Sequence, residues 1–386
     1  MFKKRCKGKH YFWTTCAFAY KIFKNVQLYA EKVLFKASKK PTLLYLCAVM
    51  AKKKLLFIAN PISGTHDKQP IIDALPRYLD SERYDYTVSW TDHRGHAAEL
   101  AQEASEASFD VCVAIGGDGT VNEVARSLRH SATALAIIPM GSGNGLARHL
   151  QIPMDPEKAL RIVADCHIED LDYGLINDRP FFCTCGMGFD AFISEKFAGS
   201  GKRGLMTYIE NTLKGGLSYQ PETYELVIDG QTEVHKAFLI ACGNASQYGN
   251  NFYIAPQASM SDGLLDVTII EPLGVLEAPQ LVMQMLNKTL DTNSHVQTFR
   301  CQSLHVHRAQ SGVIHYDGEP AEAGEDIDIR LIPKGLRVVI NAETSSTTVP
   351  FVHAMQELYD QVTSDIKSQQ RKLLAINKNL LDRIRR

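Results

Sequence analysis

The chain has 386 residues, of which 45% are hydrophobic and 22% charged, so it is long enough for two globular domains and excludes a disordered or fibrous protein. Its formal net charge of -1 excludes a general nucleic-acid binder, which needs a basic surface to displace counterions from phosphates. The nine cysteines contain no C-x-x-C pair and fit neither a zinc ribbon nor a disulfide framework, which favours a reduced, cytosolic setting. No apolar run approaches the length needed to cross a bilayer, so we expect a soluble or peripherally attached protein.

Residues 1–50 form a basic extension, in which lysine and arginine oppose the single acid Glu31 and are interleaved with aromatic and aliphatic side chains. Basic charge combined with aromatic bulk is typical of a segment that lies on an anionic membrane surface. An alternative of equal weight starts the chain at Met50, directly before the first predicted strand, and makes residues 1–49 a start-site artefact.

The first predicted strand covers residues 54–59, and the loop Asn60-Pro61-Ile62-Ser63-Gly64 ends it. Apolar residues at helical spacing predict a helix over residues 71–79, in which Pro76 predicts a kink or a break. Residues 84–90 alternate between apolar and polar side chains and predict the second strand.

The loop after the second strand runs from Thr91 to His96 and leads into a predicted helix over residues 97–107. His93 and His96 could be metal ligands, but solvated loop histidines are several times more frequent. We therefore expect these two histidines to be solvated.

Residues 111–115 are five apolar residues that run directly into Gly116-Gly117-Asp118-Gly119-Thr120. This pattern predicts a buried parallel strand that ends in a glycine-rich turn, and the helical spacing of the residues that follow predicts a helix after it. Open α/β sheets bind ligands at such a turn, where N–H groups at the helix start face an anion. The first glycine loop therefore predicts a phosphate site.

A second loop of the same design follows the apolar residues 133–140 and reads Gly141-Ser142-Gly143-Asn144-Gly145. Two such loops can enclose a polyphosphate from two sides. The repeated order of strand, loop and helix predicts a right-handed parallel sheet, in a nucleotide-binding domain over residues 51–171.

The sequence pattern changes over residues 172–342, where short apolar runs are separated by turn residues. This pattern predicts a β-sandwich domain whose last strands return to the first domain. Residues 205–213 and 275–286 are the helical exceptions. The predicted strands are residues 181–184, 224–228, 237–241, 264–270, 304–307, 327–332 and 336–340.

Residues 343–386 form a tail in which residues 357–386 predict a long helix with near-heptad apolar spacing and a basic end. This helix could pair as a coiled coil, dock on the body of the protein or lie on a membrane surface. We favour docking or pairing, so a homodimer is one expectation.

Four motifs occur in order along the chain: Asn60-Pro61-Ile62-Ser63-Gly64, residues 116–123, residues 139–148, and Asp317-Gly318-Glu319-Pro320. Together they resemble the diacylglycerol kinase catalytic family of soluble bacterial lipid kinases, which is related to sphingosine and ceramide kinases. The resemblance covers roughly residues 52–342. It implies an α/β domain like that of NAD kinase and phosphofructokinase, a C-terminal β-sandwich, and an active-site cleft between the two.

The resemblance also implies the two cofactors ATP and Mg²⁺. The ATP-binding residues that it implies are Asn60, Ser63, Gly64, Thr91, Gly116, Gly117, Asp118, Gly119, Thr120, Val121, Asn122, Gly141, Ser142, Gly143, Asn144 and Glu319.

The resemblance makes Asp317 the catalytic base, although an aspartate before glycine is also a common turn former. Asp118 is the rival catalytic residue, as a metal-linked or hydrogen-bonding carboxylate beside the phosphates. The resemblance places Mg²⁺ at the Asp262 carboxylate and the backbone carbonyls of Ser259 and Leu264, where a plain Asp-Gly hairpin turn is equally compatible with the sequence.

The implied reaction is phosphoryl transfer from ATP to a lipid hydroxyl, with diacylglycerol and phosphatidate in phospholipid biosynthesis as the first choice. The loop Gly141-Ser142-Gly143-Asn144, with Gly145 where bacterial members usually have aspartate, looks closer to sphingosine and ceramide kinases and keeps a sphingoid base or ceramide open. NAD kinases share the first glycine loop, and a non-catalytic lipid-binding protein is the alternative of another class. Walker and protein-kinase motifs are absent from the sequence.

We expect a cytoplasmic protein attached to the inner face of the membrane. Its expected partners are the anionic membrane surface and a membrane lipid substrate.

Overall fold

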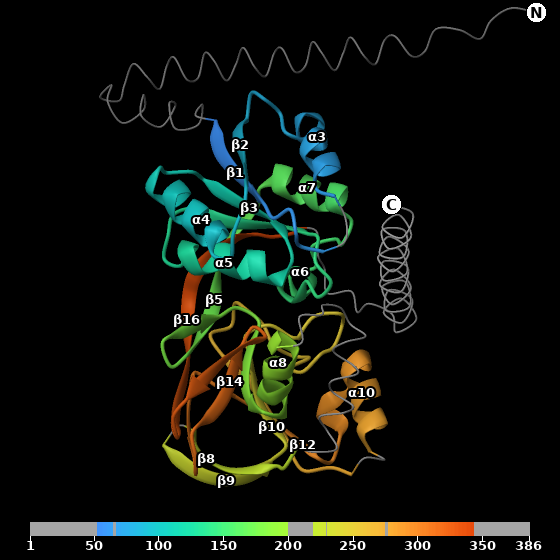
Figure 1. Ribbon diagram of the computed structural model, residues 1–386, viewed down its shortest axis with the longest axis vertical. Helices are drawn as coiled ribbons and strands as arrows, with labels where there is room; N and C mark the ends of the chain where they lie inside the picture. The colour runs from blue at the N-terminus through green and yellow to red at the C-terminus, as the bar shows by residue number, and fades with distance from the viewer. Residues whose placement is uncertain (1–51, 65–66, 200–218, 229, 275–276, 343–386) are drawn as a thin grey trace, which may run out of the picture. The chain divides into compact units, whose positions relative to one another are not determined.

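The computed structural model describes residues 52–64, 67–199, 219–228, 230–274 and 277–342 (Figure 1). Residues Lys53–Arg386 form one compact unit, and Met1–Lys52 belong to another. The predicted basic extension, the helix predicted over 205–213 and the C-terminal tail therefore lie outside the described residues. Within the described ranges, no helix combines the length and the apolar composition needed to span a lipid bilayer.

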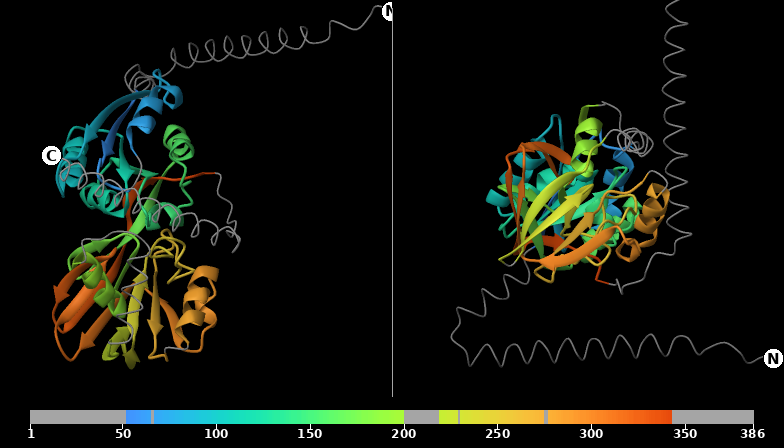
Figure 2. Two further views of the ribbon diagram at one scale, coloured as in Figure 1. Left: turned by 45° about the vertical axis from the view of Figure 1, so that its right-hand side comes forward. Right: turned by 90° about the horizontal axis from the view of Figure 1, so that it is seen from below.

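The first half of the described chain alternates strands and helices around a parallel sheet. Strands β3 and β4 are buried at every position, as their uninterrupted apolar runs predict. Helices α4 and α5 cover one face of this sheet, and α3 and α7 cover the other (Figures 1 and 2). The elements are β1 (Lys53–Ala59), α3 (Gln69–Tyr78), β2 (Tyr84–Trp90), α4 (His96–Glu106), β3 (Val111–Gly116), α5 (Asp118–Leu128), β4 (Ala134–Pro139), α6 (Gly145–His149) and α7 (Pro156–Asp165).

The parallel strands lie in the order β2-β1-β3-β4, so β1, β3 and β4 are neighbours. Their carboxyl ends lie at one edge of the sheet, where Asn60, Gly117 and Gly141 follow them. The sheet thus brings together three loops that are far apart in sequence, at the edge where open α/β sheets bind ligands.

The second half is an antiparallel β-sandwich. One sheet has the strand order β12-β11-β10-β7-β14-β15, and the strands β16, β13, β8 and β9 of the large sheet face it. The elements are β5 (Ile168–Ile176), β6 (Arg179–Phe181), β7 (Thr184–Gly188), α8 (Phe189–Gly199), β8 (Glu222–Ile228), β9 (Gln231–Ala237), β10 (Leu239–Gly243), β11 (Leu265–Ile270), α10 (Ala278–Asn287), η1 (Leu290–Thr292), β12 (Val296–Cys301), β13 (Ser303–Arg308), β14 (Gly312–Tyr316), β15 (Glu319–Ala323) and β16 (Asp326–Val339).

Both layers contribute to the sandwich core. Tyr224 and Val306 of the large sheet pack in one buried cluster with Met187, Ile240 and Val267 of the smaller sheet. This burial of alternate residues from two antiparallel sheets is what a β-sandwich requires.

Strand β16 joins the two halves. The sequence predicted two strands here, over 327–332 and 336–340, but one strand runs through both, with a register shift between Ile332 and Leu336. Lys334 at this shift has a left-handed φ of 51°. β16 pairs antiparallel with β13 and β5 and then pairs parallel with β4 at Val338 and Leu135. One ten-stranded sheet therefore extends from the α/β half into the sandwich.

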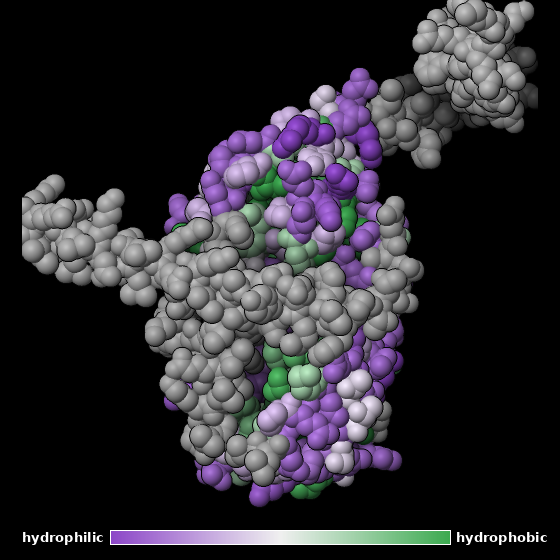
Figure 3. All heavy atoms as spheres, turned by 90° about the vertical axis from the view of Figure 1, so that its right-hand side faces the viewer, coloured by the Kyte–Doolittle hydropathy of each residue, from purple (hydrophilic) through white to green (hydrophobic). Residues whose placement is uncertain are grey.

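The face that carries α10 shows small apolar groups among polar side chains in its described part (Figure 3). Val282 and Met283 of α10 are among the exposed large hydrophobic residues. Isolated exposed apolar residues are normal on globular proteins, so they identify no binding surface by themselves.

Candidate active site

The Asn60–Gly64 loop packs against both glycine loops. The Nδ2 of Asn60 donates a hydrogen bond to Oγ1 of Thr120 at 3.0 Å. Gly64 has a left-handed φ of 63°, and a Cβ atom there would lie 1.8 Å from the carbonyl oxygen of Met140. Glycine at position 64 is therefore required by close packing as well as by backbone conformation.

Two more of the predicted residues lie at the same edge. The Ser63 hydroxyl donates to the carbonyl of Asn60 at 3.1 Å, within the loop. Thr91 is buried directly after β2, and its N–H donates to the carbonyl of Ala59 at 2.9 Å. The structure thus brings Asn60, Ser63, Gly64 and Thr91 to the edge that holds the glycine loops.

The first glycine loop opens α5. Gly117 is the N-cap residue and gives no side-chain cap, so the first N–H groups of this 11-residue helix are free to bind an anion. A Cβ atom at Gly119 would meet no atom within 4 Å. The side chains of Val121 and Asn122 are buried, so these two predicted residues can offer a ligand only their backbone. The first loop is an open anion cradle.

The second glycine loop is bound to the first by Asp118. The Asp118 carboxylate accepts from the N–H of Asn144 at 2.8 Å through Oδ2 and from the N–H of Gly145 at 2.7 Å through Oδ1. The N–H of Gly141 donates to Oδ1 of Asn144 at 3.0 Å. Backbone donors of the second loop are therefore used inside the protein, and the negative charge of Asp118 is offset by two of them.

The glycines of the second loop make room for protein atoms. A Cβ atom at Gly141 would lie 2.4 Å from Cα of Gly117, and one at Gly143 would lie 2.7 Å from Oδ2 of Asp118. That the two loops enclose a polyphosphate from two sides stays a prediction, and the structure gives the two loops different surroundings.

A loop of the sandwich, residues 244–251, covers the second glycine loop from the other side. The N–H of Asn250 donates to the carbonyl of Gly143 at 3.2 Å, and Nε of Arg148 donates to the same carbonyl at 3.0 Å. The N–H of Ser246 donates to Nδ1 of His149 at 3.1 Å, and burial lowers the pKa of His149 to about 4. The sequence analysis did not find residues 244–251, because their role depends on a contact between the two halves.

Asp317 lies in the turn between β14 and β15. It has a left-handed φ of 50°, followed by 80° at Gly318, which explains the Asp-Gly pair in a two-residue hairpin turn. The Asp317 carboxylate accepts from the N–H groups of Phe182 at 2.8 Å, Cys183 at 2.7 Å and Thr184 at 3.0 Å.

The environment of Asp317 suits a general base. Burial raises the pKa of the Asp317 carboxyl to about 6, and the three backbone hydrogen bonds oppose this rise. A carboxyl group with this pKa is ionised at neutral pH and accepts a proton more readily than an ordinary aspartate does.

Helix α5 is in direct contact with the hairpin that carries Asp317, although 199 positions separate Asp118 from Asp317 in the sequence. Nη2 of Arg126 on α5 lies 3.1 Å from Oε2 of Glu319, two residues after Asp317. Cys183, whose N–H donates to Asp317, has a thiol pKa raised well above the ordinary value, by burial first and then by the negative charges of Asp317 and Asp118. The helix that the first glycine loop opens therefore meets the hairpin that holds the candidate base.

Arg126 of α5 is a functional candidate that the sequence analysis missed. Its Nη2 lies 3.1 Å from Oε2 of Glu319, its guanidinium lies 5.1 Å from the ring centroid of Tyr316, and its charge lowers the pKa of Asp317. The Arg126 Nε is buried and has no hydrogen-bond partner among the described residues. Arg126 thus has a donor left for a ligand.

Glu319 is paired with arginines in this arrangement. Besides Arg126, Arg94 approaches its Oε1 at 3.5 Å. We predicted Glu319 as a nucleotide contact, but here its carboxylate joins α5 and the β2–α4 loop to the sandwich. Only its position beside Asp317 supports the predicted contact.

The predicted magnesium site consists of the Asp262 carboxylate and the backbone carbonyls of Ser259 and Leu264, and its carboxylate is engaged with protein groups. Asp262 Oδ1 accepts from the N–H of Leu264 at 3.1 Å, and Oδ2 is paired with the Arg300 guanidinium, which also lies 3.2 Å from Asp266. A guanidinium thus supplies the positive charge that a metal ion would supply. Magnesium at Ser259, Asp262 and Leu264 stays a prediction, and no chemical step is assigned to it.

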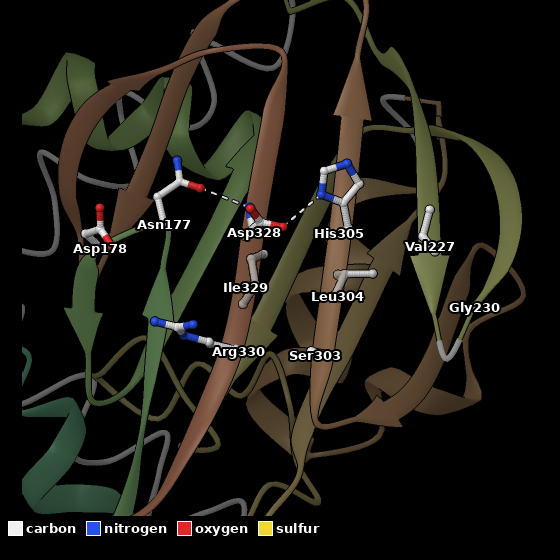
Figure 4. Close-up of a pocket in the computed structure, with 10 residues that line it drawn as sticks. All are labelled: Asn177, Asp178, Val227, Gly230, Ser303, Leu304, His305, Asp328, Ile329 and Arg330. Carbon is white, nitrogen blue, oxygen red and sulfur yellow. Dashed lines mark hydrogen bonds and ion pairs between the residues drawn. The ribbon is translucent and has the colours of Figure 1, made fainter.

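A cavity of about 590 Å³ lies elsewhere, on the outer face of the large sheet (Figure 4). Asn177, His305 and Asp328 line it, and they bond to one another: His305 Nδ1 lies 2.8 Å from Asp328 Oδ1, and the Asp328 N–H donates to Asn177 at 2.9 Å. None of the predicted site residues lines this cavity, so it is no part of the candidate active site.

Comparison with known proteins connects this geometry to a family. Residues 54–176 match the diacylglycerol kinase catalytic domain, and residues 184–340 match the YegS C-terminal NAD kinase beta sandwich-like domain. The chain is 31% identical over 245 residues to a probable lipid kinase YegS-like protein of Chromohalobacter salexigens, which covers 60% of this chain and 76% of the relative. It is 32% identical over 279 residues to a protein of the same name from Pseudomonas aeruginosa, covering 66% and 84% of the two chains.

A solved structure of a protein described as a diacylglycerol kinase from Bacillus anthracis has a TM-score of 0.60 at 20% identity and covers 76% of this chain and 98% of that one. This likeness shows the fold alone. The predicted α/β domain with a C-terminal β-sandwich is confirmed, and so is the predicted resemblance. With both domain matches and relatives above 30% identity, the chain belongs to the diacylglycerol kinase catalytic family, beside the YegS-like probable lipid kinases.

Proposed function

We propose that the chain is an ATP-dependent lipid kinase, which transfers the γ-phosphoryl group of ATP to the hydroxyl group of a membrane lipid. The observation that carries this proposal is the contact between α5, which the first glycine loop opens, and the hairpin that holds Asp317, through Arg126 and Glu319 at 3.1 Å. A phosphate cradle beside a carboxylate with a pKa of about 6 provides both the donor site and the proton acceptor of such a transfer.

The residues divide the work as follows. The N–H groups at the start of α5 bind phosphate oxygens, and Asp118 keeps the second glycine loop against the first. The lipid hydroxyl oxygen bonds to the γ-phosphorus, the bond from that phosphorus to the bridging oxygen breaks, and ADP leaves with the electron pair. The Asp317 carboxylate takes the hydroxyl proton. A Mg²⁺ ion bound together with ATP would offset the charge of the phosphates.

Diacylglycerol is the acceptor that we favour, with phosphatidate as the product and phospholipid biosynthesis as the setting. The names of the relatives support a lipid, and the name of the matching catalytic domain supports diacylglycerol. The sequence of loop residues 141–144, together with glycine at position 145, was the reason to consider a sphingoid base or ceramide. A Cβ atom at position 145 would lie 3.4 Å from Gly249 N and Tyr248 O, an ordinary van der Waals distance, so packing does not require glycine there. The sphingoid base and ceramide therefore stay the alternative acceptors.

We also propose that the protein acts on the inner face of the membrane, held there by its basic segments. Residues 1–50 and the end of the C-terminal tail supply lysine and arginine, each of which contributes about 1 kcal/mol near anionic lipid. Sedimentation with vesicles tests this: the full chain should be recovered more on anionic than on neutral vesicles, and high salt should abolish the difference. Equal recovery on both kinds of vesicle would contradict it.

The direct test of the activity is transfer of label from γ-labelled ATP to a panel of acceptors in mixed micelles. The panel contains diacylglycerol, sphingosine, ceramide, undecaprenol and NAD. We expect labelled phosphatidate. Label on sphingosine or ceramide instead would keep the lipid kinase and change the acceptor. Label on NAD alone would overturn the proposal, and lipid binding without any transfer would identify a non-catalytic lipid-binding protein.

A further inference from the structure

The β2–α4 loop gathers three possible metal ligands that the proposed reaction does not use. Asp92, His93 and His96 each offer one ligand atom, and these atoms all lie within 4.8 Å of one another. The Nδ1 of His96 lies 2.7 Å from Oδ1 of Asp92, and the Nδ1 of His93 is in hydrogen-bonding contact with the same oxygen. The two imidazole rings are stacked, with centroids 4.8 Å apart and planes at 9°. Two ring nitrogens therefore converge on one carboxylate oxygen.

The other side of His93 supplies a second, independent observation. Its Nε2 lies 3.3 Å from Oε1 of Glu99, in the first turn of α4. A ring N–H donated to Glu99 leaves the Nδ1 lone pair for another partner. Histidines that bind metals have this arrangement as a rule, because a carboxylate on the far nitrogen fixes the tautomer and strengthens the ligand.

The loop is anchored at its base and accessible at its tip. The N–H of Gly95, which has a left-handed φ of 91°, donates to Oε1 of Glu123 on α5 at 3.0 Å. The side chains of Asp92 and His93 are 75% and 54% exposed. An ion can therefore reach the ligands from solvent, and the backbone keeps their Cα positions while the exposed side chains adjust.

We propose that Asp92, His93 and His96 bind a divalent transition-metal ion of the zinc type, through one carboxylate oxygen and the Nδ1 atoms of both imidazoles, with Glu99 orienting His93. The ion takes the place between Asp92 and the two Nδ1 atoms, and any proton held there is released to solvent. Imidazole nitrogen suits Zn²⁺, Ni²⁺ or Co²⁺ at about 2.0–2.1 Å and does not suit Mg²⁺, which prefers oxygen. Water completes the coordination.

This proposal rests on the loop geometry alone, not on the proposed kinase reaction. It differs from the sequence-based expectation of two solvated loop histidines. The spacing of His93 and His96 was visible in the sequence, but the position of Glu99 behind His93 was not.

The test is metal binding by the full-length, untagged protein. Co²⁺ titration followed by visible absorption reports coordination by nitrogen and oxygen, and Zn²⁺ competition followed by calorimetry gives stoichiometry and affinity. We expect His93→Ala and His96→Ala to lose one equivalent of Zn²⁺ relative to the wild type. Glu99→Gln, which keeps all three ligands, should weaken that equivalent by about 10- to 100-fold.

His167→Ala is the matched control. The His167 side chain is 51% exposed and has its own carboxylate partner, Glu169 at 3.4 Å, but it is not part of the cluster. It should bind Zn²⁺ as the wild type does, and circular dichroism should show all four variants folded. Identical stoichiometry and affinity in the wild type, His93→Ala, His96→Ala and His167→Ala would overturn the proposal.

Discussion

The two glycine loops have nearly the same composition and the same place after a buried parallel strand, yet they differ in what surrounds them. Gly119 of the first loop faces open space, and the helix that it opens has free N–H groups. Gly141 and Gly143 of the second loop face protein atoms, with hypothetical Cβ atoms at 2.4 Å and 2.7 Å from their neighbours. Gly117 of the first loop is packed as well, since a Cβ atom there would lie 3.1 Å from Cα of Gly141. The first loop is therefore open at Gly119, where its helix begins, whereas the second loop is packed at both Gly141 and Gly143.

The difference teaches that a glycine can be required for two unrelated reasons. In one loop it lets a phosphate approach the backbone, and in the other it lets two backbones approach each other. Asp118 connects the two cases, because its carboxylate belongs to the first loop and satisfies N–H groups of the second.

The largest expected effect comes from adding one methyl group to each glycine loop in turn, which distinguishes the roles of the two loops. Gly141→Ala should abolish transfer and lower the free energy of unfolding by about 1–3 kcal/mol, because the new Cβ lies 2.4 Å from Cα of Gly117. Gly119→Ala should keep or slightly raise stability, since alanine is favoured over glycine in a helix, and should change only the affinity for ATP. Thermal unfolding and ATP titration measure both. Equal loss of stability in the two variants would contradict the distinction.

The next effect concerns the link between the loops. Asp118→Ala removes both acceptors for the N–H groups of Asn144 and Gly145, so the second loop should shift and the transfer rate should fall by about 10²-fold or more. Hydrogen exchange should accelerate at residues 141–145. If the rate falls while exchange in this loop stays unchanged, Asp118 acts on the ligand directly, and its positioning role is wrong.

A smaller effect is expected at Arg126, with Arg94 as its control. Both arginines pair with Glu319, but Arg126 is 25% exposed and influences Asp317, whereas Arg94 is 86% exposed. Arg126→Gln should lower kcat by about tenfold, a barrier change of roughly 1.4 kcal/mol. Arg94→Gln should change it less than about twofold, since exposed ion pairs contribute little. Comparable losses in both variants would mean that the Glu319 pairs act only as a structural clamp.

The smallest expected effect is a pH dependence. Burial raises the pKa of Asp317 to about 6, so its active, ionised form is lost as the pH falls through that value. The rate of wild-type transfer at limiting substrate should be level above neutrality and should fall about tenfold per pH unit well below pH 6. ATP titrates in the same range, so Asp317→Asn is the reference: its profile should contain only the ATP contribution. Profiles of the same shape would contradict ionisation of Asp317 in catalysis.

The sequence was sufficient to predict those features of the fold that depend on the local pattern of residues. The uninterrupted apolar runs predicted β3 and β4, and the turn chemistry of Asp317 and Gly318 predicted their hairpin. Strand β9 was not predicted, because most of its side chains are exposed and its sequence does not alternate between apolar and polar residues. Strands β5, β6, β12, β14 and β15 and helix α8 were also missed, and the two strands expected near the end are the single strand β16.

Within the candidate site, contacts between residues far apart in the sequence could not be predicted from local sequence patterns. Arg126 meets Glu319 across 193 positions of sequence, and Asp317 meets the N–H of Phe182 across 135. The role of Asp118 depends on the distance between two loops, which neither loop specifies alone. The order of the motifs was enough to identify the candidate site residues. Their hydrogen-bond donors and acceptors became visible only in the folded structure.

The central claim, that Asp317 is the base of a lipid kinase, is tested most directly by the turnover of Asp317→Asn at saturating ATP and diacylglycerol. The isosteric amide should fit the turn and leave both substrate affinities within about threefold, while kcat falls by roughly 10²- to 10⁴-fold. A kcat within about threefold of the wild type, in a folded variant that still binds ATP, would contradict the claim and remove Asp317 from the chemistry.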